Sequence, residues 1–241
     1  MCPICSCGSA TLTQDQLSAN AQLAAHNRTR FDSHGVLAIN LMSSTDAGNA
    51  ALLDATIVAL GNAYSIAVIE GNQKIDDVEP RIRGRGMASA QIRTVSACHI
   101  RASLVGSALQ DLPLSRVDLL FIRNVATLAG SATHDLGQHR NVTLLNSTDS
   151  NHTTTEFQLI LRTTDLVILS KADLLEVMPD IDSARAAVAL RMLGRRTPLI
   201  QSVALRARSL APWLQWIKTQ LRCRRSKQPV RAPLIGGALW S

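Results

Sequence analysis

Three cysteines at the start of the chain have the spacing of a small metal-binding arm. Cys2, Cys5 and Cys7 place three thiolates within six residues, which is enough to wrap one soft or borderline cation. The α-amine lies close enough to be a fourth donor, and this mixed nitrogen and sulfur set suits Ni²⁺ in square-planar geometry, whereas Zn²⁺ needs a tetrahedral fourth ligand. Pro3 has no amide proton to lose, so its nitrogen is not a donor. We therefore predict a nickel-binding arm; the alternative is a terminal segment with incidental thiols.

The composition indicates one globular domain with a basic C-terminal end. The chain has 241 residues, of which 46% are hydrophobic and 18% charged, which is typical of a chain that buries a core. The net charge of +7 is concentrated near the C-terminus, because nine basic residues lie between 195 and 227 and no acidic residue follows Asp182. One Tyr and three Phe are too few for a base-stacking platform, so we expect no nucleic-acid partner.

The sequence also favours a cytoplasmic protein. No apolar run approaches the roughly eighteen residues of a membrane helix, and the N-terminal segment lacks the apolar stretch of a secretory signal. We therefore expect no membrane partner, and five cysteines in a cytoplasmic protein are not expected to form a disulfide framework. Cys223 lies among arginines in the basic end, and we interpret it as a thiol without a role.

The elements that must position any site alternate between strand-like and helix-like patterns. Apolar runs of strand length occur at 35–42, 65–70, 117–122, 142–145, 166–169 and 199–203. Helical patterns occur at 17–31, 51–60, 97–109, 181–193 and 210–221. This alternation predicts an α/β fold with a mostly parallel sheet flanked by helices. We expect a flexible cysteine-rich arm at 1–16, one α/β domain at 17–221 and a basic tail at 222–241.

Ten sequence blocks stand in a characteristic order and spacing. They are CPICSCG at 2–8, NRTRF at 27–31, NLMSS at 40–44, VIEG at 68–71, RIR at 81–83, CHI at 98–100, LLFIRNV at 119–125, DLG at 135–137, LSKADLL at 169–175 and PWLQWI at 212–217. In this order they resemble the nickel-incorporation GTPases of hydrogenase maturation, the HypB family, and the match runs nearly without gaps from about residue 27 to 217. The resemblance implies a P-loop G domain that dimerises, binds GTP with Mg²⁺, and passes nickel toward a [NiFe]-hydrogenase precursor.

The phosphate loop, residues 43–50, departs from the pattern that the resemblance implies. A working loop needs glycines that close on the phosphates, a lysine that reaches them and a hydroxyl that holds Mg²⁺. Asn49 stands where the family has this lysine, Ala50 where it has the hydroxyl residue, and Asp46 at a glycine position, while Gly48 is retained. The residues expected to line the nucleotide site are Ser43, Ser44, Gly48, Asn49, Lys171 and Asp173.

The other nucleotide motifs are also altered. Asn72 and Val78 replace acidic residues after the second strand, Arg123 replaces the acidic residue after the LLFI strand, and Ala126 replaces a glycine. The guanine motif at 170–173 is best preserved. Its lysine is expected to pack on the base and its aspartate to accept from the ring, and the alternative is a strand end followed by a helix cap. We expect weakened or absent GTP binding and no intact catalytic residue, because phosphoryl transfer depends on these charges.

The resemblance also implies a second candidate metal site, at Cys98 and His99. In the family this pair joins a further cysteine to bind nickel or zinc between subunits, but Gly130 stands in that position here. A two-fold dimer would bring two pairs together in a set that suits Zn²⁺, and His134 is another possible ligand. The alternative is a structural pair without a metal, with a buried cysteine beside a surface histidine. Arg101 carries a positive charge just after the pair, which disfavours a cation there.

Two functional interpretations follow from these residues. The first is a nickel-binding maturation factor whose partners are the hydrogenase large-subunit precursor, other maturation factors and a second copy of the chain. The second is a catalytically inactive G-domain relative that acts as a metal-buffering or dimerisation scaffold. An unrelated enzyme is less favoured, because no Ser-His-Asp or paired-carboxylate arrangement is present.

Overall fold

The fold is built on a seven-stranded parallel sheet, as the alternation of apolar runs predicts. The computed structural model describes residues 14–43, 46–71, 88–92, 100–125, 135–146, 160, 162–170, 197–202 and 207–226. The strand order is β3-β2-β4-β1-β5-β6-β7, and every neighbouring pair is parallel. The strands are β1 (Leu37–Ser43), β2 (Ile66–Gly71), β3 (Ala88–Gln91), β4 (Leu119–Val125), β5 (Arg140–Asn146), β6 (Leu166–Ser170) and β7 (Leu199–Ser202).

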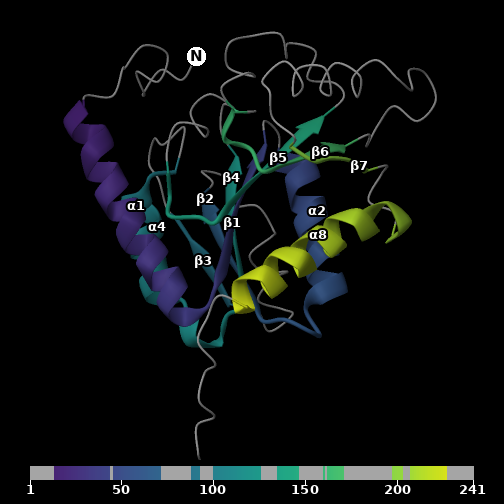
Figure 1. Cartoon of the computed structure of the whole chain (residues 1–241), viewed down its shortest axis with the longest axis horizontal. Helices are drawn as coiled ribbons and strands as arrows, with labels where there is room; N and C mark the ends of the chain where they lie inside the picture. The colour runs from purple at the N-terminus through teal and green to yellow at the C-terminus, as the bar shows by residue number, and fades with distance from the viewer. Residues whose placement is uncertain are drawn as a thin grey trace, which may run out of the picture.

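Helices cover both faces of this sheet (Figure 1). One face carries α2 (Asp46–Leu60) and α8 (Ala207–Arg225), and the other carries α1 (Gln14–His34) and α4 (Ala102–Ala108). Two short 3₁₀ turns, η1 (Leu109–Asp111) and η2 (Leu114–Arg116), follow α4. Strand residues alternate between the two faces, so every residue of β1 is buried. This explains why its sequence is a continuous apolar run rather than an alternating one.

Several predicted boundaries differ from the structure. Helix α1 begins at Gln14 rather than 17, and α4 begins at Ala102 rather than 97, because Ile100 and Arg101 are not helical. Strand β3 was not predicted, since ASAQ has no apolar run and is held as an edge strand by pairing with β2. Helix α8 continues to Arg225, so residues 222–225 belong to the helix and not to a separate tail. The predicted helix at 181–193 lies outside the described residues.

Helix α8 is attached to the sheet face by tryptophan packing. Trp213 is almost completely buried, and its indole N–H donates to Thr56 Oγ1 of α2 at 2.8 Å. Its ring lies 6.3 Å from that of Phe121 in β4 and 5.7 Å, stacked, from that of Trp216. Because the buried indole N–H is satisfied, the ring can fill the core without an unpaired polar group. The PWLQWI block is therefore a packing element.

Two further sequence blocks, NRTRF and DLG, meet on the opposite face. The side-chain amide of Asn27 in α1 donates to the carbonyl oxygens of Ala102 at 2.8 Å and Leu136 at 3.1 Å. Gly137 has a φ of +90°, and a Cβ there would lie 2.5 Å from the carbonyl oxygen of Ala24. Only glycine fits such a position. Arg28 Nε donates to the Gly137 carbonyl at 2.6 Å, so these blocks tie α1 to α4 and to the strand-leading segment 135–139.

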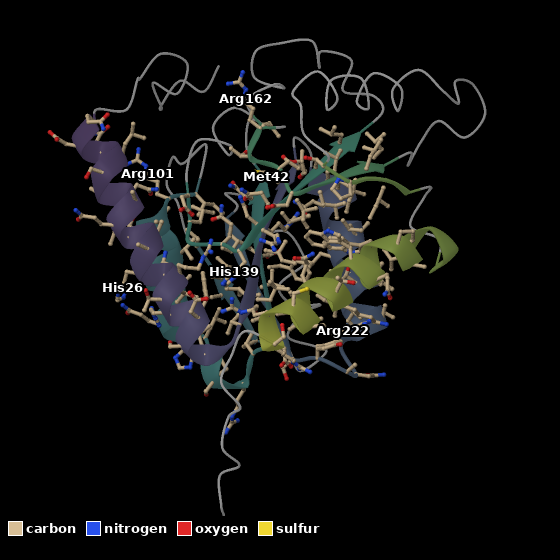
Figure 2. All side chains as sticks on the ribbon, viewed as in Figure 1. His26, Met42, Arg101, His139, Arg162 and Arg222 are labelled. Atoms are coloured by element: carbon tan, nitrogen blue, oxygen red, sulfur yellow. The ribbon has the colours of Figure 1, made fainter. Side chains whose placement is uncertain are left out.

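His139 joins the C-terminal ends of α1 and α8 (Figure 2). The backbone N–H of Ala38 donates to its Nδ1 at 3.0 Å, and its Nε2 lies 3.1 Å from Asp32 Oδ1 and 2.6 Å from Arg224 Nη1. Arg224 of α8 donates to the same carboxylate oxygen at 2.8 Å and to the Phe31 carbonyl at 3.0 Å. Burial lowers the pKa of His139 to about 4, against the hydrogen bond to Asp32, which raises it.

This arrangement predicts that stability falls on mild acidification. The unfolded chain binds a proton at His139 below its ordinary pKa of 6.5, whereas the folded chain resists protonation down to about 4. The contribution of neutral His139 to the free energy of unfolding is therefore fully present above pH 6.5. It is lost as the pH falls toward 4, by on the order of 3 kcal/mol at most. The positive charges of Arg28 and Arg224 face the ring and act in the same direction.

Urea unfolding between pH 7.5 and 4.5 measures this loss, with His139→Asn as the matched variant. An asparagine oxygen can still accept from Ala38 N–H but does not titrate. Burial acts to raise the pKa of Asp32, but the hydrogen bonds of Arg224 and His139 and their charges together lower it below its ordinary value. An equally steep pH dependence in the asparagine variant would contradict the assignment to His139.

Candidate nucleotide and metal sites

Two of the residues expected to bind nucleotide, Ser43 and Asn49, are described with their side chains, and both lie at the carboxyl end of β1. Ser43 ends β1, and α2 begins at Asp46, so the connection between them has the strand, short loop and helix arrangement of a phosphate loop. In Figure 2, Met42 marks this end of the sheet, above His139. Ligands of open parallel sheets bind at this edge. Residue 44 and the side chains of residues 46–48 are not among the described parts, so the predictions for Ser44 and Gly48 stay predictions.

Asn49, at the phosphate-loop lysine position, turns toward the sheet. Its side chain is fully buried, and Nδ2 donates to Ser43 Oγ at 3.0 Å with a longer contact of 3.4 Å to the Leu41 carbonyl oxygen. Its Oδ1 is buried without a hydrogen-bond partner. The amide is thus used to hold the end of β1 against the first turns of α2. A short, neutral side chain in this position brings no positive charge to a phosphate group.

Arg123, at the acidic position after the LLFI strand, forms a buried ion pair with Glu70. Arg123 Nη1 lies 3.0 Å from Glu70 Oε1, and the two side chains are 2% and 4% exposed. Leu41, Arg123 and Glu70 form one row across β1, β4 and β2, because the strand registers pair Leu41 with Arg123 and Arg123 with Glu70. The row lies on the face covered by α2, where Leu41 and Phe121 are core residues.

These residues do not fit the Mg²⁺ and nucleotide that the resemblance implies. Mg²⁺ is held by hard, negatively charged or hydroxyl oxygens, but position 123 carries a guanidinium, which is paired with the Glu70 carboxylate of the same row. The position of the phosphate-binding cation holds a buried amide. A second cation beside Arg123 would be repelled within a site of low dielectric. Asn49 and Arg123 are therefore the described residues on which the prediction of a weakened nucleotide site rests, and that prediction stays a prediction.

The guanine motif begins at the same edge. Ser170 is the last residue of β6, and the strand register places it beside Asn146 of β5 and Ser202 of β7. The carboxyl end of β6 is thus level with the end of the sheet that carries the phosphate loop. Lys171 and Asp173 are beyond the described part, so their role in binding a guanine base stays a prediction.

The predicted metal ligands are also outside the described ranges. They are Cys2, Cys5, Cys7, Cys98, His99 and the possible substitute His134. Within the residues that the structure describes, no group of three or more His, Cys, Asp or Glu side chains is arranged to hold a metal. Arg101, whose charge we expect to disfavour a nearby cation, is exposed, and Cys223 is an exposed free thiol in α8.

Sequence reasoning missed Glu70 as a member of the site. The signal was present, because an acidic residue that ends the buried run IAVIE requires a counter-charge. Its partner Arg123 is 53 residues away, and only the pairing of β2 with β4 identifies it. Among the described helices, none is long and apolar enough to cross a membrane.

Comparison with known proteins supports the resemblance over most of the chain. The hydrogenase maturation factor HypB of Azotobacter vinelandii is 37% identical over 213 residues, which cover 87% of this chain and 69% of that relative. HypB of Escherichia coli strain K12 is 32% identical over 209 residues, covering 87% of this chain and 71% of the relative. No family model matches.

A solved structure agrees with this result. HypB from Helicobacter pylori, crystallised in complex with nickel, superposes with a TM-score of 0.77 at 25% identity, covering 89% of this chain and 99% of that one. The signal recognition particle 54 kDa protein of Aeropyrum pernix, in complex with GDP, has a TM-score of 0.51 at 11% identity, a likeness that concerns the fold alone.

Proposed function

The chain belongs to the HypB family of hydrogenase maturation factors, and from this premise we propose that it binds nickel and delivers it during maturation of a [NiFe]-hydrogenase. The observation that carries this proposal is the similarity over 87% of the chain, together with a fold shared with a relative solved in complex with nickel. Nickel is the cargo, and we propose Cys2, Cys5 and Cys7 as its ligands.

We propose the hydrogenase large-subunit precursor and other maturation factors as partners, in the cytoplasm, rather than a membrane or a nucleic acid. The direct test measures the nickel content of a [NiFe]-hydrogenase large subunit in cells that lack their own nickel-incorporation factor. Expression of this chain is expected to raise that content, and the variant lacking the three arm cysteines is expected not to. Equal nickel content with and without the chain would reject a delivery role.

A metal-buffering or dimerisation scaffold is the second candidate function. It is favoured by the buried Arg123 and Glu70 pair and by the inward Asn49 amide, which leave the phosphate loop without its expected charges. A scaffold would keep the nickel arm and the dimer contact but would use no nucleotide cycle. The two candidates differ in whether nickel reaches the hydrogenase precursor, so the same nickel-content measurement separates them.

We further propose that Cys98 and His99 mediate metal-dependent dimerisation. Two copies of the pair would supply two thiolates and two imidazoles, a tetrahedral set that suits Zn²⁺ better than Ni²⁺. Because Arg101 adds a positive charge close by in the sequence, dimerisation is expected only at Zn²⁺ concentrations well above those that saturate the arm.

Light scattering on the full chain with alanines at the three arm cysteines isolates this effect. The mass is expected to double with Zn²⁺ and to stay monomeric when Cys98→Ala is added. A mass that never doubles, or that doubles equally well without Cys98, would show that this pair holds no shared metal. Cys223→Ala is the matched control, since it removes an exposed thiol elsewhere on the chain.

A further inference from the structure

We infer that Arg123 supplies, from within the chain, the positive charge that a phosphate-loop lysine and Mg²⁺ bring to a nucleotide-binding centre, so that this centre is held in one arrangement without nucleotide. The meaning of positions 49 and 123 rests on the family relationship, and the consequence for nickel rests on the proposed function. It goes beyond a loss of activity, because it assigns a constructive role to the two replacements.

Glu70 is the residue that makes a cation necessary. Its side chain is 4% exposed, and a buried carboxylate is strongly destabilising unless it is paired and hydrogen-bonded. Arg123 Nη1 donates to its Oε1 at 3.0 Å across the β2 and β4 pairing. The ion pair therefore connects the carboxyl ends of two adjacent central strands by a contact that needs no bound group.

Asn49 is the complementary replacement. Its amide contacts the carbonyl oxygen of Leu41 at 3.4 Å, and Leu41 is the direct register neighbour of Arg123. A lysine at position 49 would bring a second positive charge into this same row, where like charges repel strongly at low dielectric. A neutral residue at 49 and a cation at 123 are thus compatible with each other. In this chain the positive charge therefore lies on β4, at Arg123, and not on α2, where the family has its lysine. We call this difference the charge relocation.

The inference predicts that nickel binding by the arm is independent of nucleotide. The ends of β1, β2 and β4 are held by Asn49 and by the ion pair, so a response to GTP that moves α2 away from β1 or separates β2 from β4 would first have to break these buried contacts. We therefore expect the arm to bind the same amount of nickel with the same affinity whether or not GTP and Mg²⁺ are present.

The charge relocation is tested by thermal unfolding of the full chain at pH 7.5. Arg123→Met removes the guanidinium that is paired with the buried Glu70 carboxylate and is expected to lower the Tm by about 10 °C. Adding Asn49→Lys to this variant is expected to recover most of the loss, because the lysine supplies the missing cation. The matched control Asn49→Met, which has no charge, is expected not to recover it. In the unaltered chain, Asn49→Lys alone is expected to lower the Tm.

A second background keeps the test decisive if Arg123→Met is too unstable to measure. Glu70→Gln combined with Arg123→Met removes both charges, which is expected to leave the Tm within a few degrees of the parent. Adding Asn49→Lys there is expected to lower the Tm, the opposite of its effect when Glu70 is present. A lysine effect of the same sign in both backgrounds, or equal recovery by Asn49→Met, would overturn the inference.

Nickel titration of the unaltered chain with and without GTP and Mg²⁺ completes the test. A nickel affinity that changes several-fold with nucleotide would overturn the predicted independence and leave nickel delivery standing. An absence of nickel binding under all conditions would contradict the proposed function, whereas the Tm pattern would still decide the charge relocation. The two failures are therefore distinguishable.

Discussion

Alanine substitution at Cys2, Cys5 and Cys7 is expected to abolish high-affinity nickel binding, which in the unaltered protein has a stoichiometry of one Ni²⁺ per chain. Each single substitution removes one of three thiolates that no neighbouring residue replaces. The loss is expected to exceed the roughly 10- to 100-fold cost of removing a mere outer-shell partner of a metal ligand. Equilibrium dialysis with Ni²⁺, read together with the thiolate charge-transfer absorption, measures affinity and ligand type at once.

Cys223→Ala is the matched control for this experiment. Cys223 is an exposed free thiol in the last turn of α8, so its removal tests whether any accessible cysteine accounts for the binding. The control is expected to keep the full nickel affinity. If the triple alanine variant binds nickel as tightly as the unaltered chain, the arm is not the site.

GTP turnover by the unaltered chain is expected to be negligible. The phosphate-binding cation and the Mg²⁺ ligands are replaced by Asn49, Ala50 and Arg123, and each such loss typically costs about a hundredfold or more in rate. Asn49→Lys with Ala50→Thr is expected to improve Mg²⁺-dependent GTP binding, because phosphate can balance the added charge. Turnover is expected to recover only in part, since Asn72 and Arg123 remain.

Single-turnover hydrolysis and equilibrium binding of GTP, GDP and ATP measure these effects separately. Asn49→Gln with Ala50→Thr is the matched control, because it restores the hydroxyl and lengthens the side chain at position 49 by one methylene without adding a charge. It is expected to leave GTP binding weak. Rapid hydrolysis by the unaltered chain that no substitution in residues 43–50 removes would contradict this interpretation of the phosphate loop.

The architecture was predictable because parallel strands are buried on both faces. Val36 to Met42 is completely buried, and such a strand must be apolar along its whole length, which makes it visible in the sequence. Strand β3 was not predictable in this way, since the residues ASAQ carry little apolar side chain and acquire their conformation from pairing with β2. The last turn of α8 was also not predicted, because Arg224 and Arg225 have the composition of a solvated tail and are held in the helix by tertiary contacts.

Those two arginines show how tertiary contacts determine the meaning of a charge. Arg224 binds Asp32 and the Phe31 carbonyl, and Arg225 donates to Asp118 at 3.0 Å. The partners are separated from them by more than a hundred residues. No local pattern reports such a distance in sequence, whereas packing α8 against the sheet brings the groups together.

Some features of the candidate site are likewise determined by the sequence, and others only by the tertiary structure. The chemical types at positions 49, 50 and 123, and the three thiols of the arm, are properties of the sequence, because a side chain's charge and donor atoms do not depend on the fold. That Asn49 turns toward β1, and that Arg123 pairs with a buried Glu70, was decided only by the tertiary structure. The strand register places residues 70 and 123 side by side, and burial makes their pairing a requirement, since an isolated charge in the core is strongly destabilising.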